Sequence, residues 1–440
     1  MKRGFLVLMI QKYRLEKGGY INRDKIISFK FNGKKLFGYK GDTLASALLA
    51  HGIHLVGRSF KYHRPRGFIG AGVDEPNAKV QLYTGARTEP NALATEIELV
   101  EGLIAKSQNC WPSVNFDLGS INNLLNKFFP AGFYYKTFMW PKNFWYKIYE
   151  PIIRKAAGLG VAPLKPDPDR YEHKFEYCDV LIAGSGPSGL ASAVAAAKNG
   201  ARVILAEDKP RFGGSLLIDD VTIGNKKGKD WVDEIISQLK SMPNVIVRNR
   251  SQIFGYYDHN MIVMIEKTRD HLDKPNKYTP RQRLWYIRAK EVIISTGSIE
   301  RPLVFGNNDR PGIMLASAAK EYMKIYGVLV GKKPIIFTNN DSAYDCAIEF
   351  KQNGIDPIVL DIRNDPTSSV VKEAQNLNIT IKFSHGVVNT KGYKRVNSAT
   401  IGKLNRNKSD YENLENISCD CICVSGNWTR NCTPIFTVWK

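Results

Sequence analysis

The feature that most constrains the fold is a glycine-rich turn inside residues 178–215, placed between an apolar run and an alanine-rich segment. The run Val180–Ala183 predicts a short buried parallel strand, and it ends at the pattern GSGPSG. In such a turn Gly184 permits the sharp bend, Gly186 lets the main chain approach a pyrophosphate, and Gly189 lets helix and strand pack closely. The following helix presents free N–H groups to the anion. We therefore predict a dinucleotide site whose phosphates are held by the main chain.

Later segments extend this pattern. The strand Arg202–Ala206 ends at Glu207, at roughly the twenty-residue spacing where an acidic side chain meets ribose hydroxyls, which favours a 2′-OH over a 2′-phosphate. Gly214 belongs to a glycine pair that lets the chain pass close to a cofactor, and Thr296 and Gly297 end a strand that we expect to return to it. The alternative is a glycine turn in a nucleotide-free sheet. The residues alone favour neither FAD nor NAD over the other.

A second strand–helix–strand unit follows, with strands at 334–337 and 356–360 around a helix at 343–352. Its turn, residues 338–342, contains no glycine, so its main chain cannot easily approach a pyrophosphate. We expect one dinucleotide site in the chain. A self-contained flavin–nicotinamide reductase needs two, and many add a reactive Cys-x-x-Cys pair that this sequence lacks.

The N-terminal part predicts a β-grasp, ferredoxin-like module. Two apolar runs flank Asn32-Gly33, a pair typical of a tight hairpin because both turn positions need a positive φ. Asp42 and Thr43 then cap a helix predicted over 44–50. The further strands that we expect are 80–83 and 94–100.

No cysteine lies between Met1 and Asn109, so a cysteine-ligated [2Fe–2S] cluster in this module is excluded. The loop after the predicted helix carries arginines instead, Arg58, Arg64 and Arg66 among them. They could hold a phosphate or an acidic partner surface, or they could brace neighbouring parts of the chain through hydrogen bonds. Both interpretations remain open from the sequence.

The seven cysteines form no regular framework, which argues against structural disulfides. Cys419, Cys421 and Cys423 alternate along a predicted strand, so we interpret them as buried thiols rather than as metal ligands. We predict no metal site and no catalytic residue in this chain.

Residues 111–169 form a connector rich in aromatic side chains and broken by prolines. These side chains must be covered, and the flanking domains and another subunit are the expected partners. Stacking on single-stranded nucleic acid is the alternative, but the basic residues do not alternate with the rings. The net charge of +21 comes from scattered lysines, which indicates solvated faces rather than a nucleic-acid or membrane partner.

We thus predict an α/β chain with a cluster-less β-grasp (ferredoxin-like) module and an FAD/NAD(P)-binding, doubly wound Rossmann-type domain with an inserted second unit. The expected division is an N-terminal extension (1–20), the β-grasp domain (21–105), the connector (106–170) and the Rossmann-type domain (171–440), with the degenerate second unit at about 315–400.

Several blocks carry a resemblance to one family. They are GDTLASALLAHGIHLVGRSFKYHRPRG, SQNCWPSVNFD, AGFYYKTFMWP, YEPIIRKAAGLG, the Rossmann stretch, STGSIERPLVFGNNDRPGIM and FTNNDSAYDCA. The chain resembles the α subunit of heterotetrameric sarcosine oxidases from about Tyr13 to Trp428. Related amine dehydrogenases, such as N-methylglutamate dehydrogenase, share parts of the pattern.

The resemblance implies a cytoplasmic complex of α, β, γ and δ subunits that demethylates sarcosine to glycine, with hydrogen peroxide and formaldehyde or 5,10-methylenetetrahydrofolate as products. It implies NAD in this chain, FAD in the β subunit and FMN at the contact between α and β. Carried over onto this sequence, the NAD contacts fall on Gly184, Gly186, Ser188, Gly189, Glu207, Asp208, Lys209 and Ser215.

The family's α subunit continues into a folate-binding domain, whereas this sequence stops at Lys440 and departs from the pattern after Trp428. The expectation is a truncated or frame-shifted product. Two other functions stay open: a stand-alone FAD-dependent oxidoreductase, and an assembly scaffold without a bound nucleotide.

Overall fold

The computed structural model describes residues 11–128, 132, 138–156, 160–405, 407 and 410–431. Residue contacts group the chain into two compact units. Unit 1 contains Met1–Asp167 and Glu300–Asn427, and unit 2 contains Pro168–Ile299 and Trp428–Lys440. The domain bounds predicted from the sequence remain a prediction.

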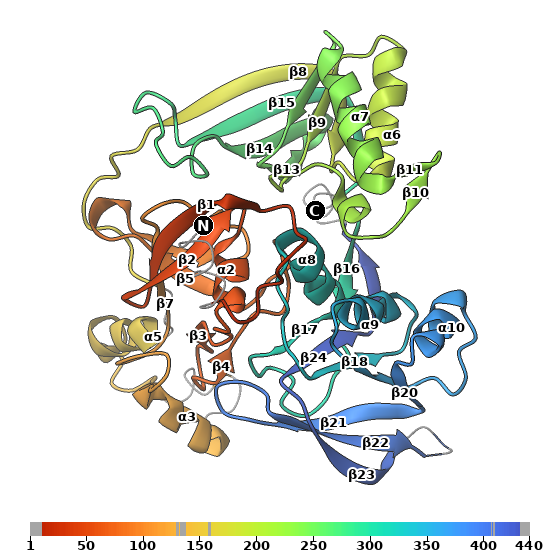
Figure 1. The fold of residues 1–440 in the computed structure, drawn as a ribbon. Helices are drawn as coiled ribbons and strands as arrows, with labels where there is room; N and C mark the ends of the chain where they lie inside the picture. The colour runs from red at the N-terminus through yellow and green to blue at the C-terminus, as the bar shows by residue number, and fades with distance from the viewer. Residues whose placement is uncertain are drawn as a thin grey trace. The chain divides into compact units, whose positions relative to one another are not determined.

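The N-terminal part of unit 1 is built on a five-stranded sheet in the order β2-β1-β7-β5-β6 (Figure 1). Its strands are β1 (Asn22–Phe31), β2 (Lys34–Lys40), β5 (Lys79–Leu82), β6 (Glu89–Leu93) and β7 (Ile104–Ser107). The predicted hairpin is confirmed, because β1 and β2 pair antiparallel around Asn32 and Gly33, which have φ of +50° and +79°. The predicted helix is also confirmed as α2 (Leu44–Ala50), and Thr43 caps it in a reciprocal pair with Ser46.

The strand predicted over 94–100 is wrong. The strand in this region is β6, and residues 94–96 form a turn. The carbonyl groups of Ala94 and Ile97 accept hydrogen bonds from the N–H groups of Ala45 and Leu44, at 2.9 and 2.8 Å. The segment therefore satisfies the first turn of α2, whose N–H groups have no acceptor within the helix, instead of pairing in the sheet.

Short elements complete the N-terminal part. They are β3 (Gly57–Arg58), β4 (Pro65–Arg66), η1 (Gly85–Arg87), η2 (Leu118–Ser120), α3 (Ile121–Leu124), η3 (Asn126–Phe128), the π-helical η4 (Trp145–Tyr149) and α5 (Glu150–Ala156). The last five belong to the predicted aromatic connector, part of which lies outside the described residues.

The rest of unit 1 contains a parallel five-stranded sheet in the order β17-β24-β18-β19-β20. Its strands are β17 (Ile313–Leu315), β18 (Pro334–Thr338), β19 (Ile358–Asp361), β20 (Thr380–Phe383) and β24 (Cys421–Ser425). The helices are α8 (Ala316–Tyr326), α9 (Ser342–Gln352) and α10 (Ser369–Asn376). The predicted second strand–helix–strand unit is therefore present as β18, α9 and β19.

One face of this sheet packs against a three-stranded antiparallel sheet of β21 (His385–Lys391), β22 (Ser398–Leu404) and β23 (Tyr411–Ser418). Ile335 and Phe337 of β18 share a buried cluster with Val387 of β21 and with Ala399 and Ile401 of β22. Burial on both faces explains why the parallel strands are continuous apolar runs.

Unit 2 is organised around a six-stranded sheet in the order β12-β9-β8-β15-β14-β13. The strands are β8 (Tyr171–Ala183), β9 (Val203–Ala206), β12 (Val245–Arg248), β13 (Ser251–Tyr257), β14 (Met261–Lys267) and β15 (Gln282–Ile294). Its helical and minor elements are α6 (Pro187–Lys198), η5 (Gly214–Leu217), β10 (Thr222–Ile223), β11 (Lys226–Lys227), α7 (Gly228–Ser241) and η6 (Asp258–Asn260). Two short strands, β16 (Ser298–Arg301) and β25 (Asn427–Arg430), follow in the chain.

The helices α6 and α7 lie side by side on the sheet of unit 2 (Figure 1). Leu190 of α6 and Val232 of α7 share a buried cluster with Ile182 of β8 and with Val203 and Leu205 of β9. The strand β8 pairs parallel with both β9 and β15. The carboxyl ends of three parallel strands therefore meet at the edge of the sheet where α6 begins, which is where open α/β sheets bind ligands.

Candidate dinucleotide site

The predicted glycine turn joins β8 to α6. Gly184 has φ of +97°, and a Cβ atom there would lie 2.4 Å from the carbonyl oxygen of Ser295. A Cβ atom on Gly189 would lie 2.0 Å from the carbonyl oxygen of Gly184. Both positions therefore require glycine, because the main chains of strand and helix approach too closely for a side chain.

Gly186 differs from its two neighbours. A Cβ atom there would have no heavy atom within 4 Å, and the residue is the N-cap of α6 without a side-chain cap. In the first turn of the twelve-residue helix Pro187 has no N–H group, and the N–H groups of Ser188 and Gly189 have no acceptor inside the helix. Ser188 is exposed. This open side, with unpaired donors and no side chain, fits a pyrophosphate.

Glu207 follows β9 and lies opposite the turn. Its Oε2 atom accepts hydrogen bonds from the N–H and the hydroxyl of Ser185, at 2.9 and 2.5 Å, and its Oε1 atom accepts the N–H of Lys209 at 3.0 Å. The residue is only 6% exposed. Burial, followed by the neighbouring Asp208, raises the pKa of Glu207 to about 8, although the hydrogen bonds from Ser185 and Lys209 oppose this.

The remaining predicted residues after β9 reach the same place. The N–H of Gly213 donates to the carbonyl and to the hydroxyl of Ser185, at 3.1 and 3.2 Å. Gly214 has φ of +54°, and a Cβ atom on it would lie 3.1 Å from the Cα atom of Gly186. Ser215 and Asp208 are exposed. The glycine pair therefore passes directly beside the turn, as a cradle for a bound group requires.

Thr296 and Gly297 also lie beside the turn. The N–H of Ser295 donates to the carbonyl of Ala183 at 2.8 Å, which brings this segment against the end of β8. The Thr296 hydroxyl, however, donates to the carbonyl of Asn431 at 2.5 Å. Gly297 is exposed with φ of +70°. The Thr296 hydroxyl therefore already donates its hydrogen bond to the main chain of its own unit.

The second strand–helix–strand unit has a different strand end. Asp361, at the end of β19, is buried and accepts hydrogen bonds from Arg363 at 3.0 and 2.8 Å and from the Tyr344 hydroxyl at 2.8 Å. Arg363 also pairs with Asp341, at 2.7 Å, in the turn before α9. The carboxylate that corresponds to Glu207 is thus neutralised by an arginine of the same chain.

The arginine-rich loop braces unit 1. The guanidinium of Arg64 binds both carboxylate oxygens of Asp309 at 2.6 Å, and Arg66 binds the same carboxylate. Arg58 donates to the carbonyl of Val114 at 3.0 and 2.7 Å. Burial acts to raise the pKa of Asp309, but the hydrogen bonds from Arg64 and Arg66 lower it to about 2. The bracing interpretation is confirmed for these three arginines.

Glu75 lies in the same part of the N-terminal module and was not anticipated. Its Oε2 atom accepts the N–H groups of Ile69 and Gly70, at 2.6 and 2.8 Å, and its Oε1 atom accepts those of Asn77 and Ala78, at 2.6 and 3.0 Å. The side chain is buried. In cluster-bearing ferredoxin modules this loop holds an anionic iron–sulfur group; here a carboxylate receives the main-chain donors. The lone signal in the sequence is an acidic pair, Asp74-Glu75, after two glycines.

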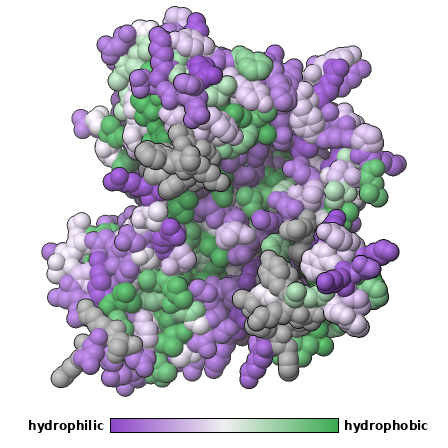
Figure 2. Space-filling view, turned by 180° about the vertical axis from the view of Figure 1, so that it is seen from behind, coloured by the Kyte–Doolittle hydropathy of each residue, from purple (hydrophilic) through white to green (hydrophobic). Residues whose placement is uncertain are grey.

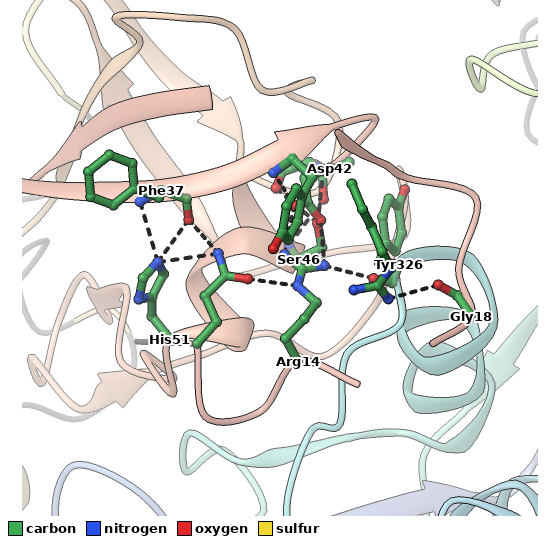
Figure 3. A network of polar contacts seen from close by, with 11 residues as sticks. Arg14, Gly18, Phe37, Asp42, Ser46, His51 and Tyr326 are labelled. Atoms are coloured by element: carbon green, nitrogen blue, oxygen red, sulfur yellow. Dashed lines mark hydrogen bonds and ion pairs between the residues drawn. The ribbon is translucent and has the colours of Figure 1, made fainter. Parts of the chain in front are cut away.

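A buried polar network joins three parts of unit 1 (Figure 3). Arg14 binds both oxygens of Asp42, at 3.0 and 2.7 Å, and the carbonyl of Tyr326 at 2.7 Å. Ser46 of α2 donates to Asp42 at 2.7 Å, and Gln11 accepts from Arg14 at 2.8 Å. These side chains are hydrogen-bonded to one another and to the main chain, so the network holds these parts of unit 1 together.

Within the described residues no group of three or more His, Cys, Asp or Glu side chains is placed to hold a metal ion. Cys419, Cys421 and Cys423 are buried, as the strand pattern predicted. Burial raises the pKa of the Cys419 thiol to about 12, which suits an unreactive thiol. None of the described helices has the length and apolar character that a membrane span requires.

Two family models match parts of the chain. Residues 24–110 match a model described as a 2Fe-2S iron-sulfur cluster binding domain, and residues 179–243 match one described as FAD dependent oxidoreductase. The first match ends at Cys110, which is its one cysteine. Both matches, together with the observed sheets, confirm the predicted α/β fold class of a ferredoxin-like module with an FAD/NAD(P)-binding domain.

Whole-chain comparisons confirm the predicted resemblance. The chain is 46% identical, over 95% of its length, to sarcosine oxidase subunit alpha of Rhizobium meliloti (strain 1021), and 33% identical over 93% to that of Corynebacterium sp. (strain U-96). It spans 41% and 38% of these two relatives. The crystal structure of L-proline dehydrogenase from P. horikoshii has the same fold, with a TM-score of 0.60, 19% identity and coverage of 98% of this chain and 65% of the other.

Proposed function

We propose that this chain is the dinucleotide-binding part of an α-type subunit in a sarcosine oxidase complex. The complex would be an oxidoreductase acting on the CH–NH bond of sarcosine, yielding glycine with hydrogen peroxide and formaldehyde or 5,10-methylenetetrahydrofolate. The similarity to two sarcosine oxidase α subunits, each matched over more than nine-tenths of this chain, supports the proposal.

We assign NAD to the glycine turn of unit 2. The main chain of Gly186, Ser188 and Gly189 would hold the pyrophosphate, because its N–H groups are open on that side. Glu207 would accept hydrogen bonds from the adenosine ribose. A 2′-phosphate would instead be pressed against a buried carboxyl group, which supplies no positive charge to pair with the phosphate and so disfavours a phosphorylated dinucleotide.

The observation that carries this proposal is the position of Glu207. Ser185 and Lys209 fix its carboxyl group beside the turn with hydrogen bonds of 2.5–3.0 Å. A carboxyl group held in this way is ready for a ribose hydroxyl without a change of rotamer, because Oε1 accepts the Lys209 N–H and has a further lone pair, whereas Oε2 already accepts two hydrogen bonds from Ser185. Asp208, Lys209 and Ser215 would contact the adenosine side.

A bound dinucleotide supplies hydride or electron transfer that protein side chains cannot perform. The residues of this chain would bind and orient it, and we assign no acid, base or nucleophile here. By resemblance, sarcosine would be oxidised at FAD on a β subunit, and FMN would lie where α and β meet. The γ and δ subunits would complete a cytoplasmic complex.

FAD in the same site is the second candidate. The family model that matches residues 179–243 is described as FAD dependent oxidoreductase, and the ribose acid and glycine turn suit either dinucleotide. In that case the chain could act as a stand-alone flavoprotein or in a related amine dehydrogenase, such as one acting on N-methylglutamate.

The test is a ligand titration of the purified chain, followed by thermal unfolding. Because a ligand that binds the folded state raises its stability, NAD should raise the unfolding temperature in a concentration-dependent way. Gly186→Val should abolish this effect, because the added side chain fills the open side of the turn. Ala195→Val, at an exposed position in the same helix, is the matched control and should respond to NAD as the unmodified chain does.

If FAD and not NAD raised the unfolding temperature, the result would favour the second candidate, a flavoprotein with FAD in this site. Equal responses of the Gly186→Val and unmodified chains would contradict the placement of the site.

A further inference from the structure

The connector of unit 1 exposes large apolar side chains at unusual density. We call the exposed side chains of residues 111–128 and 138–152 the connector surface. Leu124 and Trp140 are each 82% exposed and Tyr146 is 81% exposed, and Ile121 and Met139 also face solvent. Isolated exposed apolar residues are ordinary, whereas a concentration of them marks an interaction site. Figure 2 shows that apolar residues gather in patches among hydrophilic ones on the face in view.

The first part of the connector surface is held in place by the N-terminal module. Asp117 accepts the N–H groups of Trp111 and Gly119, at 2.9 and 3.2 Å, and pairs with His63 at 2.6 Å. Arg58 holds the carbonyl of Val114. In the second part, the ring of Tyr149 packs on that of Phe144, with centroids 6.3 Å apart. The exposed side chains are thus presented on an ordered backbone, which lowers the entropy cost of binding.

The stretch of the connector between Asp117 and Glu150 carries charge of one sign. It contains four lysines and no acidic residue. Lys127, Lys142 and Lys147 are exposed. A partner that fits this surface presents an apolar centre, rich in contacts for Trp and Tyr, with carboxylates around it.

We propose that the connector surface is the docking face for a partner polypeptide with an acidic rim, the neighbouring subunit of the oxidase. This inference rests on the proposed role as a subunit, which the similarity to two sarcosine oxidase α subunits supports. The Trp, Tyr, Met, Ile and Leu side chains would form the buried centre of the contact, and the three lysines would pair with acidic groups at its edge.

Other occupants fit less well. A second copy of this chain in a two-fold contact would set lysines against lysines, which is repulsive. A membrane surface usually receives the apolar face of one amphipathic helix, whereas the exposed side chains here come from separate segments: α3, the residues Met139 and Trp140 that lie outside any helix, and the continuous helical stretch of η4 and α5. Both occupants remain as outcomes of the test.

The test uses the full chain, tagged and co-expressed with the subunits encoded beside its gene. The double substitution Leu124→Asp with Trp140→Asp places charges in the centre of the connector surface. It should reduce the partner retained on the tag at least about tenfold, as loss of central contacts does. Leu414→Asp, at a position 57% exposed on β23, is the matched control and should retain the partner fully.

The charge component is tested separately. Changing Lys127, Lys142 and Lys147 to Glu should weaken retention, and it should remove the decrease that added salt causes with the unmodified chain. The unfolding temperature of these variants, which reports on folding, should not change. Their response to NAD, which reports on unit 2, should not change either.

Full partner retention by the double variant would overturn the inference. A double variant that keeps its partner but no longer binds vesicles of phosphatidylcholine and phosphatidylglycerol would also overturn the inference, because it would indicate a membrane site. A double variant that loses only self-association would overturn it too, because it would indicate a contact between copies of this chain. An unmodified chain that binds NAD but retains no partner would overturn this inference and leave the nucleotide site standing. An unmodified chain that retains its partner but does not bind NAD would contradict the nucleotide site and leave this inference standing.

Discussion

Glu207 combines a proposed role in binding with a cost to stability. Its carboxyl group is buried beside the glycine turn, and its pKa is raised to about 8 from an ordinary value of 4.5. At low pH the group is protonated in both the folded and unfolded states. As the pH rises, the unfolded chain ionises first, so the folded state loses stability between about pH 4.5 and pH 8 and changes little above that.

We therefore predict that Glu207→Gln flattens this pH dependence. Between pH 5 and pH 9 the unmodified chain should lose about 4 kcal/mol more free energy of unfolding than the variant loses. Urea denaturation at several pH values measures both chains. Parallel pH profiles would contradict the raised pKa of Glu207, and the variant should also lose affinity for the dinucleotide.

Glu75 is the second residue with a specific role. Its carboxylate accepts four main-chain N–H groups of the loop that carries cysteines in cluster-bearing modules. Burial raises its pKa, and these hydrogen bonds oppose the rise. The loop is thereby ordered by a side chain of its own.

Glu75→Gln should destabilise the chain by about 3 kcal/mol, because the amide NH₂ group would face N–H donors and leave them unsatisfied. Hydrogen exchange should become faster at the amides of residues 69–78. Glu412→Gln, at an exposed position of β23, is the control and should leave exchange in that loop unchanged. Unaltered exchange in the Glu75 variant would show that other contacts order the loop.

At the scale of elements, a buried ion pair fastens the segment before β1 to the rest of unit 1. Arg14 joins Asp42, at the start of α2, to the carbonyl of Tyr326, the last residue of α8. Both side chains of the pair are fully buried. The removal of one partner leaves an uncompensated charge in the interior, which is costly.

Arg14→Met should therefore lower the free energy of unfolding by about 3–5 kcal/mol. The double variant Arg14→Met with Asp42→Leu should recover much of this loss, because the unpaired charge is removed. Thermal or denaturant unfolding of the single and double variants measures the coupling. Strictly additive losses would mean that the pair contributes little beyond its separate contacts.

Elements that depend on local sequence were predictable. The hairpin at Asn32-Gly33, the helix α2, and the strands and turn around Gly184 follow from turn chemistry and from runs of apolar residues. The strand predicted over 94–100 failed because its carbonyls are used by the first turn of α2, a contact that no local pattern reveals. The cage around Glu75 was missed for the same reason, since it gathers N–H groups from both sides of a loop.

In the candidate site, too, some features could be predicted from local sequence and others could not. Its glycines and Glu207 could be placed from spacing alone, because each has a backbone or ribose requirement tied to a strand end. The contact of the Thr296 hydroxyl with Asn431 could not, because it joins residues far apart in the sequence.

At the scale of the molecule, the two units have separate hydrophobic cores and different strand ends. One offers an open glycine turn, whereas the other has Arg363 paired with Asp361 and Asp341. NAD should therefore slow hydrogen exchange around residues 184–189 and 207–215 and leave the ends of β18 and β19 unaffected. Protection at both places would indicate a second nucleotide site.

The most direct measurement is to identify the small molecule released from the chain when it is purified with its partner subunits. The complex is denatured, and the released nucleotides are separated and identified by mass and absorbance. We predict NAD in a one-to-one ratio with this chain, and no NAD when Gly186→Val replaces the unmodified chain. FAD bound by this chain when it is purified alone, with no NAD in the complex, would contradict this prediction.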